Sequence, residues 1–151
     1  MANLRGAVIG YGLAGSVFHA PRIASTPGLM VGTVVASNPA RQAEAAPAHP
    51  DARVVPDPEA VFERASEHDF VVVATPNKVH VPLARRALDA GLPVVVDKPL
   101  APTAAEARSL ADHADEVGVL PTVFRNRRWD SEQLTVRCLL NDRRLGEVMR
   151  Y

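Results

Sequence analysis

Hydrophobic residues occur along this chain in short runs, separated by stretches with amphipathic spacing. Each run has the length of a buried strand, and together the runs cover residues 7–9, 29–36, 53–55, 70–74, 92–96 and 119–124. Helical spacing fills the intervals, from about residue 16 and over 39–46, 58–64, 79–90, 103–117 and 130–140. The run 70–74 is apolar on both faces, as a central parallel strand is. The alternation predicts an α/β fold with a doubly wound, mainly parallel sheet.

Helix boundaries carry their own signals. Gly91 is placed to end the helix before it. Thr103 followed by Glu106 has the spacing of a capping box. Asp130 is expected to cap the last helix, and Cys138 within that helix is expected to pack in the core.

Composition narrows the function classes. A chain of 151 residues with 47% hydrophobic content predicts one folded domain. Its 17 basic and 17 acidic residues give no global attraction to nucleic acid or to a membrane. One cysteine excludes a disulfide framework and the common zinc patterns, and no metal site is expected. Neither a signal peptide nor a run of membrane-spanning length is visible, so a cytoplasmic location is expected.

A glycine motif follows the first apolar run. Its six residues are Gly10, Tyr11, Gly12, Leu13, Ala14 and Gly15. In this pattern the first glycine permits a tight turn, the second lets the backbone approach a pyrophosphate, and the third lets the helix pack against the strand. The alternative is a purely structural strand-to-helix turn. Because the motif lies inside a predicted strand–helix–strand unit, it predicts a dinucleotide site.

The end of the second apolar run bears on which dinucleotide binds. NAD sites usually place an acid there for the ribose hydroxyls, yet no Asp or Glu precedes Glu44. The chain instead offers Ser37, Asn38 and Arg41, which suit a 2′-phosphate. The alternative is that Ser37 and Asn38 form a turn and a cap while Arg41 is solvated. We predict NADP rather than NAD as the cofactor.

The fourth run ends in a second polar segment. Ala74, Thr75, Pro76 and Asn77 come where a strand neighbouring the first should end, and we expect them to contact the ribose or nicotinamide. Asn77 alternatively caps the next helix. His80 lies one helical turn further on, and we predict that it also contacts the cofactor. The alternative is a structural role, which is more common for a lone histidine on a helix.

Asp97, Lys98 and Pro99 close the fifth run and place a lysine at the carboxyl edge of the sheet. Ligands bind at this edge in open α/β sheets. The ammonium of Lys98 could polarise a carbonyl or hydrogen-bond a hydroxyl, with Asp97 holding its charge. The alternative is a surface salt bridge in a loop.

The sixth run is followed by a basic and aromatic segment. Asn126, Arg127 and Trp129 are predicted to flank the nicotinamide or a phosphate. A nucleic-acid site is disfavoured because the segment is short and is interrupted by Asp130 and Glu132.

Taken together, these motifs resemble the N-terminal half of the Gfo/Idh/MocA oxidoreductases, which include glucose–fructose oxidoreductase and inositol dehydrogenases. The family usually has Glu where this chain has Asp97. The shorter acid occurs in a subgroup that resembles NADP-dependent scyllo-inositol dehydrogenases. The resemblance implies that Lys98 is catalytic, close to the nicotinamide and the reacting carbon. The matching segments are 10–15 with 18–21, 75–77 with His80, 90–91 leading to 97–99, and 124–130.

Length is the main departure from that family, whose members usually run to more than twice this size. Their second α/β domain dimerises, completes the substrate pocket and supplies a catalytic histidine or acid. We therefore expect residues 1–145 to form the dinucleotide-binding domain and 146–151 to begin the missing one. The expected function is the cofactor half of an NADP-dependent oxidoreductase acting on a polyol, inositol or sugar by hydride transfer, homo-oligomeric only in a full-length form. The alternative is a stand-alone NADP-binding module without turnover.

Overall fold

The computed structural model describes residues 3–147 and 149. Its six strands form one parallel sheet in the order β3-β2-β1-β4-β5-β6. This confirms the predicted doubly wound fold. The strands are β1 (Leu4–Ile9), β2 (Leu29–Val35), β3 (Arg53–Val55), β4 (Phe70–Val73), β5 (Val94–Val96) and β6 (Pro121–Val123).

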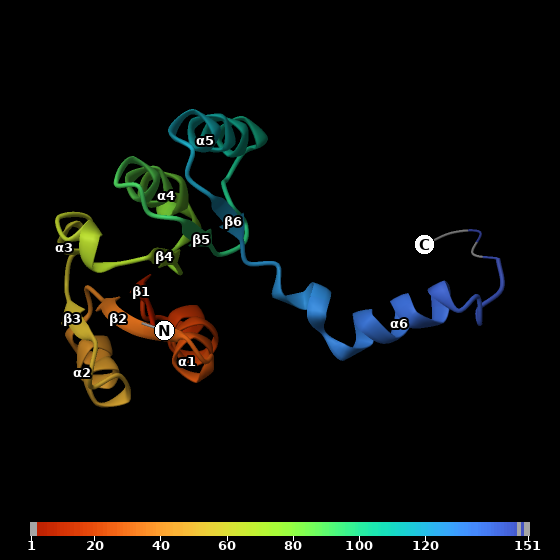
Figure 1. Ribbon diagram of the computed structural model, residues 1–151, viewed down its shortest axis with the longest axis horizontal. Helices are drawn as coiled ribbons and strands as arrows, with labels where there is room; N and C mark the ends of the chain where they lie inside the picture. Colours follow the sequence, from red (N-terminus) through yellow and green to blue (C-terminus); the bar gives the residue numbers. More distant parts are fainter. Residues whose placement is uncertain (1–2, 148, 150–151) are drawn as a thin grey trace.

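Helices cover both faces of the sheet (Figure 1). One face is covered by η1 (Ala14–His19), α1 (Ala20–Ser25) and α2 (Pro39–Ala48). The other is covered by α3 (Glu59–Phe62), η2 (Ala65–Glu67), η3 (Asn77–Val79), α4 (His80–Asp89) and α5 (Ala104–Val117). The strand order reverses between β1 and β4, and this switch point opens the crevice in which such folds bind ligands.

The core consists of two layers that share the central strands. Along β1, Ala7 and Ile9 belong to the layer under α4 and α5, whereas Val8 belongs to the layer under α1. This alternation follows from the two-residue period of a strand. All three side chains are at most 2% exposed, so β1 is buried on both faces.

Local structure departs from the sequence predictions at two helices. The helix after the glycine turn begins at Ala14, earlier than expected, and its first six residues have π geometry. The expected helix 58–64 is shorter, because only Glu59–Phe62 is α-helical. Thr103 is confirmed as the N-cap, since the Glu106 amide donates to its Oγ1 at 3.2 Å. The Glu106 carboxylate accepts from the Thr103 hydroxyl at 2.7 Å, in place of the backbone amide that a full capping box would use.

Helix α6 (Ser131–Asn141) stands apart from the sheet, at the end of an arm that includes η4 (Asn126–Trp129) (Figure 1). None of the described residues of α6 is buried. Cys138 is exposed, so the prediction that it packs in the core is wrong: its helix contacts no core layer. Asp130 takes the N-cap position but makes no capping bond with its side chain, which pairs with Arg127 at 3.2 Å instead.

Two further expectations concern the ends and surface of the molecule. The segment 146–151, expected to begin the second domain, falls half outside the described residues, since 148, 150 and 151 are not among them. Over the described part of the chain, no helix combines the length and apolar character that a membrane crossing requires.

Candidate functional site

A pocket of about 670 Å³ lies at the carboxyl ends of β1, β2 and β4. This is the switch point of the sheet, and it includes the glycine turn for which the sequence predicts a dinucleotide site. Nine of the predicted cofactor contacts line it: Gly10, Tyr11, Gly12, Ser37, Asn38, Arg41, Ala74, Thr75 and Pro76. Segments from three separate strand ends therefore meet at one cavity.

The glycine turn forms one wall of this pocket. Gly10 has a φ of +100°, and a side chain there would collide with the carbonyl group of Ala74. A Cβ on Gly15 would collide with the carbonyl oxygen of Gly10, so this glycine permits the close packing of helix on strand. Gly12 differs, because a Cβ there meets no atom within 4 Å. The backbone of Gly12 thus borders open pocket space that a ligand can approach.

The end of β2 forms the second wall. Asn38 Oδ1 accepts a hydrogen bond of 2.9 Å from the Ala40 amide, so the alternative of Asn38 as a helix cap is observed. Arg41 lines the pocket while its Nη1 donates to Glu44 at 2.6 Å. Both partners of this pair are about half exposed, so the pair is weak enough for an anion to displace Glu44.

Thr75 supplies an unpartnered polar group at the end of β4. It lines the pocket, and its Oγ1 is buried with no hydrogen-bond partner among the described residues. Buried hydroxyls are nearly always bonded, so such an atom beside a pocket fits a polar ligand group. With open space at Gly12 and a cation at Arg41, the residues present fit a dinucleotide.

The apolar part of the pocket was not predicted from the sequence. It consists mainly of Pro56 and Pro58 after β3, with Val79, Pro82 and Leu83 from η3 and α4. The two prolines follow the end of β3, so their position at a strand end is the sequence signal that marks them. Apolar walls of this kind are typical of small-molecule sites, where few polar groups fix the orientation.

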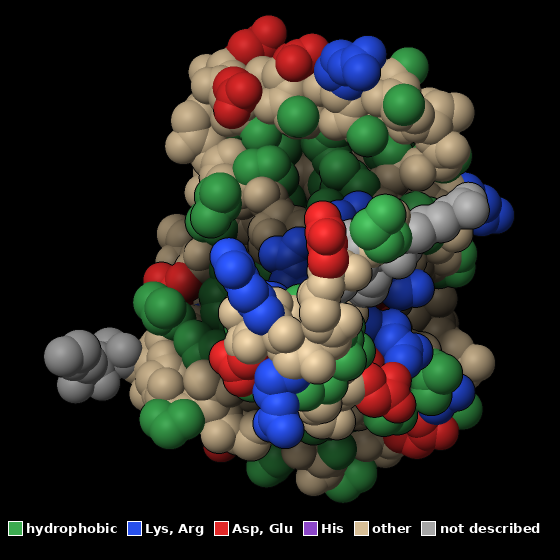
Figure 2. Space-filling model, turned by 90° about the vertical axis from the view of Figure 1, so that its right-hand side faces the viewer, with side chains coloured by type: hydrophobic (Ala, Val, Ile, Leu, Met, Phe, Trp, Pro, Cys, Tyr) green, Lys and Arg blue, Asp and Glu red, His purple; other side chains and the backbone are tan. Residues whose placement is uncertain are grey.

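Lys98 lines a different pocket, of about 330 Å³, together with Asn126 and Arg127. Arg125 and Arg128 also line it, so the site is strongly basic. Figure 2 views the molecule from the side of α6 and shows Lys and Arg side chains gathered around this arm. Trp129 is 67% exposed and lines neither pocket.

Asp97 pairs with a buried histidine. His19 Nε2 lies 3.3 Å from Asp97 Oδ1, its ring is 4% exposed, and it packs on Phe124 with ring centroids 4.3 Å apart. Burial lowers the pKa of His19, and the Asp97 carboxylate opposes that shift only in part. The expectation that Asp97 holds the charge of Lys98 is therefore corrected: its observed partner is His19.

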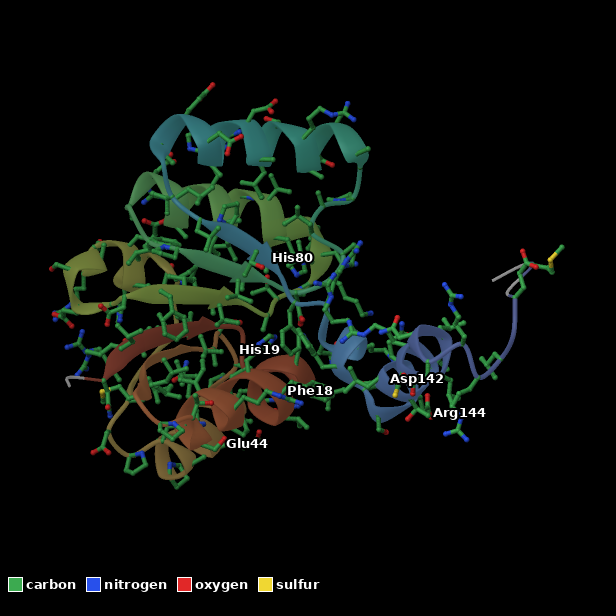
Figure 3. All side chains as sticks on the ribbon, turned by 45° about the vertical axis from the view of Figure 1, so that its right-hand side comes forward. Phe18, His19, Glu44, His80, Asp142 and Arg144 are labelled. Atoms are coloured by element: carbon green, nitrogen blue, oxygen red, sulfur yellow. The ribbon has the colours of Figure 1, made fainter. Side chains whose placement is uncertain are left out.

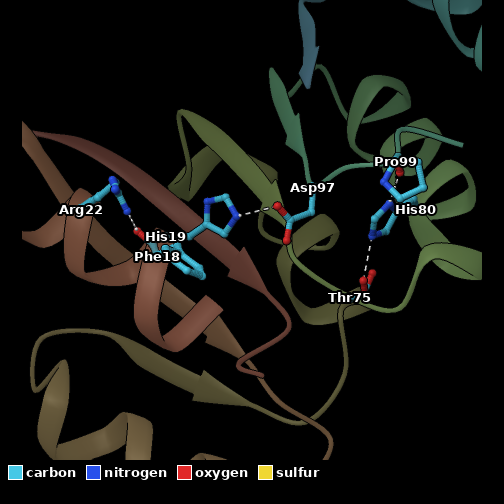
Figure 4. Close-up of polar contacts among 7 residues, drawn as sticks. All are labelled: Phe18, His19, Arg22, Thr75, His80, Asp97 and Pro99. Atoms are coloured by element: carbon cyan, nitrogen blue, oxygen red, sulfur yellow. Dashed lines mark hydrogen bonds and ion pairs between the residues drawn. The ribbon is translucent and has the colours of Figure 1, made fainter. Parts of the chain in front are cut away.

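His80 also lies at this edge, on the opposite side of the sheet from His19 (Figure 3). Its side chain is 1% exposed, with Nδ1 2.8 Å from the Pro99 carbonyl and Nε2 2.7 Å from the Thr75 carbonyl (Figure 4). Both nitrogens are engaged, so the prediction of His80 as a cofactor contact is not supported. Asn77 begins η3 and does not line the pocket, and no side-chain capping bond forms there.

The remaining predicted contacts, Leu13 and Ala14, lie at the start of η1 and outside the pocket lining. Leu13 is 71% exposed. Neither side chain is needed for phosphate binding, since backbone amides bind the phosphate at such turns.

Known proteins share this arrangement. The family model described as "Oxidoreductase family, NAD-binding Rossmann fold" matches residues 4–124. The chain is 43% identical to the uncharacterized oxidoreductase YdgJ of Escherichia coli K12, over 97% of this chain and 41% of that protein. It is 35% identical to the scyllo-inositol 2-dehydrogenase (NADP(+)) IolW of Bacillus subtilis, over 95% of this chain and 39% of that protein.

A solved structure agrees. A candidate oxidoreductase from Klebsiella pneumoniae superposes with a TM-score of 0.90 at 42% identity, over 98% of this chain and 42% of that one. The chain thus spans about two fifths of the length of the relatives that it matches. With the glycine turn, the switch-point pocket and the match over 4–124, the chain belongs to the Gfo/Idh/MocA oxidoreductases as their NAD-binding Rossmann domain.

Proposed function

We propose that this chain is the cofactor-binding half of an NADP-dependent oxidoreductase that acts on the CH–OH group of a polyol, inositol or sugar. The observation that carries the proposal is the corner of the pocket at the end of β2. Ser37 and Arg41 line it, and no Asp or Glu is among the described residues that do. A carboxylate there would repel a 2′-phosphate, whereas a guanidinium can bind one.

Each part of the pocket has a role in this proposal. The backbone around Gly12 lies against the pyrophosphate, and Arg41 exchanges Glu44 for the 2′-phosphate. The hydroxyl of Thr75 donates to the nicotinamide half, which gives this buried atom the partner that it lacks. The bound nicotinamide supplies the hydride acceptor or donor.

Lys98 is the residue that we assign to catalysis. Its side chain is exposed at the same edge of the sheet, among the arginines of the second pocket. There the ammonium binds the substrate oxygen and stabilises negative charge as the C–H bond breaks or forms. Substrate choice, oligomer formation and the proton-transfer partner are assigned to the part of the relatives' length that this chain does not span.

Fluorescence titration of the 151-residue chain with NADPH and NADH tests the cofactor assignment. We expect tighter NADPH binding, and a loss of about 10- to 150-fold for NADPH but not for NADH in Arg41→Ala, because one charge-assisted bond is worth roughly 1.5–3 kcal/mol. The matched control is Arg64→Ala, since Arg64 forms the same kind of i,i+3 pair with Glu67 away from this pocket. Equal affinity for the two cofactors would defeat the assignment.

Assays of inositols and sugars separate this function from a stand-alone binding module. We expect turnover in a longer form that includes the region matched to the rest of the relatives, and NADPH binding in both forms. Binding without turnover in both would favour the module.

A further inference from the structure

Lys98 lies between two residues that are each held by a buried histidine. Asp97, before it, contacts His19, and the carbonyl of Pro99, after it, contacts His80 (Figure 4). The two histidines come from different faces of the sheet, His19 from η1 and His80 from the start of α4. The loop that carries the lysine is therefore attached to both layers of the protein.

Both ring nitrogens of His80 face hydrogen-bond acceptors. Both of its partners are backbone carbonyl oxygens, and a carbonyl oxygen only accepts hydrogen bonds. A neutral imidazole carries one N–H, which would leave the other nitrogen facing an acceptor with its lone pair. Two donors require the imidazolium. The distances of 2.8 and 2.7 Å lie at the short end for N–H···O and match charge-assisted bonds.

Burying an imidazolium at this position would have a cost that the surroundings must offset. Three charged residues lie on the segments next to His80. Lys78 is on η3, directly before α4, and Asp97 and Lys98 are on the loop that leads to Pro99. Asp97 is the one anion among them, and the two lysines oppose a further positive charge. The two short bonds to carbonyl oxygens are thus the main compensation, since a buried charge needs hydrogen-bonded partners.

His19 uses the opposite chemistry. Burial keeps it in the neutral form, and one N–H at Nε2 faces the carboxylate of Asp97. Its ring is fixed by packing on Phe124. One histidine thus holds an anionic side chain as a neutral donor, and the other holds two backbone carbonyls as a double donor.

We propose that His19 and His80 are positioning residues for Lys98: His80 joins the Thr75 and Pro99 carbonyls as an imidazolium, and His19 holds Asp97. Because Thr75 lines the cofactor pocket, the same bridge connects that pocket to the lysine loop. The proposal rests on the proposed function only in treating Lys98 as the catalytic group.

Nitrogen-15 NMR of the 151-residue chain, with ring-labelled histidine at neutral pH, tests the bridge in the wild-type protein. We expect both ring nitrogens of His80 to carry protons, with the signal assigned by its loss in His80→Gln. A neutral tautomer, with one unprotonated ring nitrogen in His80, would overturn the bridge.

The positioning role is tested on the lysines themselves. The chain has two, Lys78 and Lys98, so reductive methylation with carbon-13 gives few signals to assign. His19→Gln and His80→Gln should each shift the Lys98 signal, and His19→Gln should leave Lys78 unchanged. The matched control is His113→Gln, because His113 pairs with Asp89 on another part of the surface. An unshifted Lys98 signal in folded His19→Gln would refute the role.

These outcomes stay separate from those of the proposed function. If His80→Gln does not fold, the wild-type nitrogen spectrum and the His19→Gln shift still decide the matter. If Lys98→Met retains full turnover in a longer, active form, the catalytic assignment of Lys98 fails while the histidine results stand. In that longer form, His19→Gln should lower kcat and leave the affinity for NADPH unchanged.

Discussion

The sheet with its two helical layers and the arm that follows it were predicted from the same kind of pattern, yet they differ in what they bury. Leu110 on α5 is fully buried between helix and sheet, whereas Leu134 on α6 is 37% exposed and touches neither core layer. Apolar spacing defines the face of a helix but not the surface that covers it. The family model ends at residue 124, where the arm begins.

The largest expected effect is a difference in stability between alanine variants of these two leucines. Leu110→Ala should lower the free energy of unfolding by about 2–5 kcal/mol, because it leaves a cavity in a closed core. Leu134→Ala should change it by much less, about 0.5 kcal/mol, since Leu134 is partly exposed and belongs to neither core layer. Urea denaturation of the 151-residue chain measures both. Comparable losses in the two variants would show that α6 is part of the cooperative core.

A smaller effect follows from the histidines, all of which lie in the core part of the sequence. Burial lowers the pKa of His19 and of His68 below the ordinary value of 6.5. Below pH 6.5 the unfolded chain therefore binds protons that the folded chain does not. The stability from this source is complete above pH 6.5 and is lost as the pH falls through the lowered folded-state values.

Urea denaturation at about pH 7.5 and about pH 5.5 measures this loss. We expect the free energy of unfolding to fall less, from the higher to the lower pH, in His68→Gln than in the wild-type chain. This variant removes one of the three histidines, His19, His49 and His68, whose pKa is lowered by burial. The arm contains no histidine, so the exposure of its residues should not change over the same range. The same pH dependence in His68→Gln as in the wild-type chain would contradict the burial of this ring.

The smallest expected effect concerns Cys138. Because this thiol is exposed, a thiol reagent should modify it in the folded chain without denaturant, and Cys138→Ser should change the stability by less than about 0.5 kcal/mol. Absorbance of the released thiolate from an aromatic disulfide reagent gives the rate. Protection of the thiol until the core unfolds would mean that α6 packs after all.

Much of the fold could be predicted from the sequence, because the signals for it are local. Strand runs, the Thr103–Glu106 cap and the glycine turn are local signals, and parallel strands bring their carboxyl ends to one edge without further information. The predicted contacts at 10–12, 37–41 and 74–76 all follow strand ends, and the structure gathers them at one pocket.

What the sequence could not supply depends on contacts between distant residues. His19 and Asp97 are 78 positions apart, and His80 meets Pro99 through a backbone carbonyl that has no sequence signature. The exposure of α6 could not be predicted from the sequence either, because an amphipathic pattern is the same whether or not another surface covers its apolar face.

The uniform direction of the six strands has one practical consequence. Every segment of the cofactor pocket leaves the sheet at one edge, while Leu4 begins β1 at the opposite edge. A six-residue strand separates the two by about 20 Å, at roughly 3.3 Å per residue. An immobilising tag or a fused reporter at the amino end would therefore face away from the pocket, and cofactor could still enter a chain attached to a surface by that end.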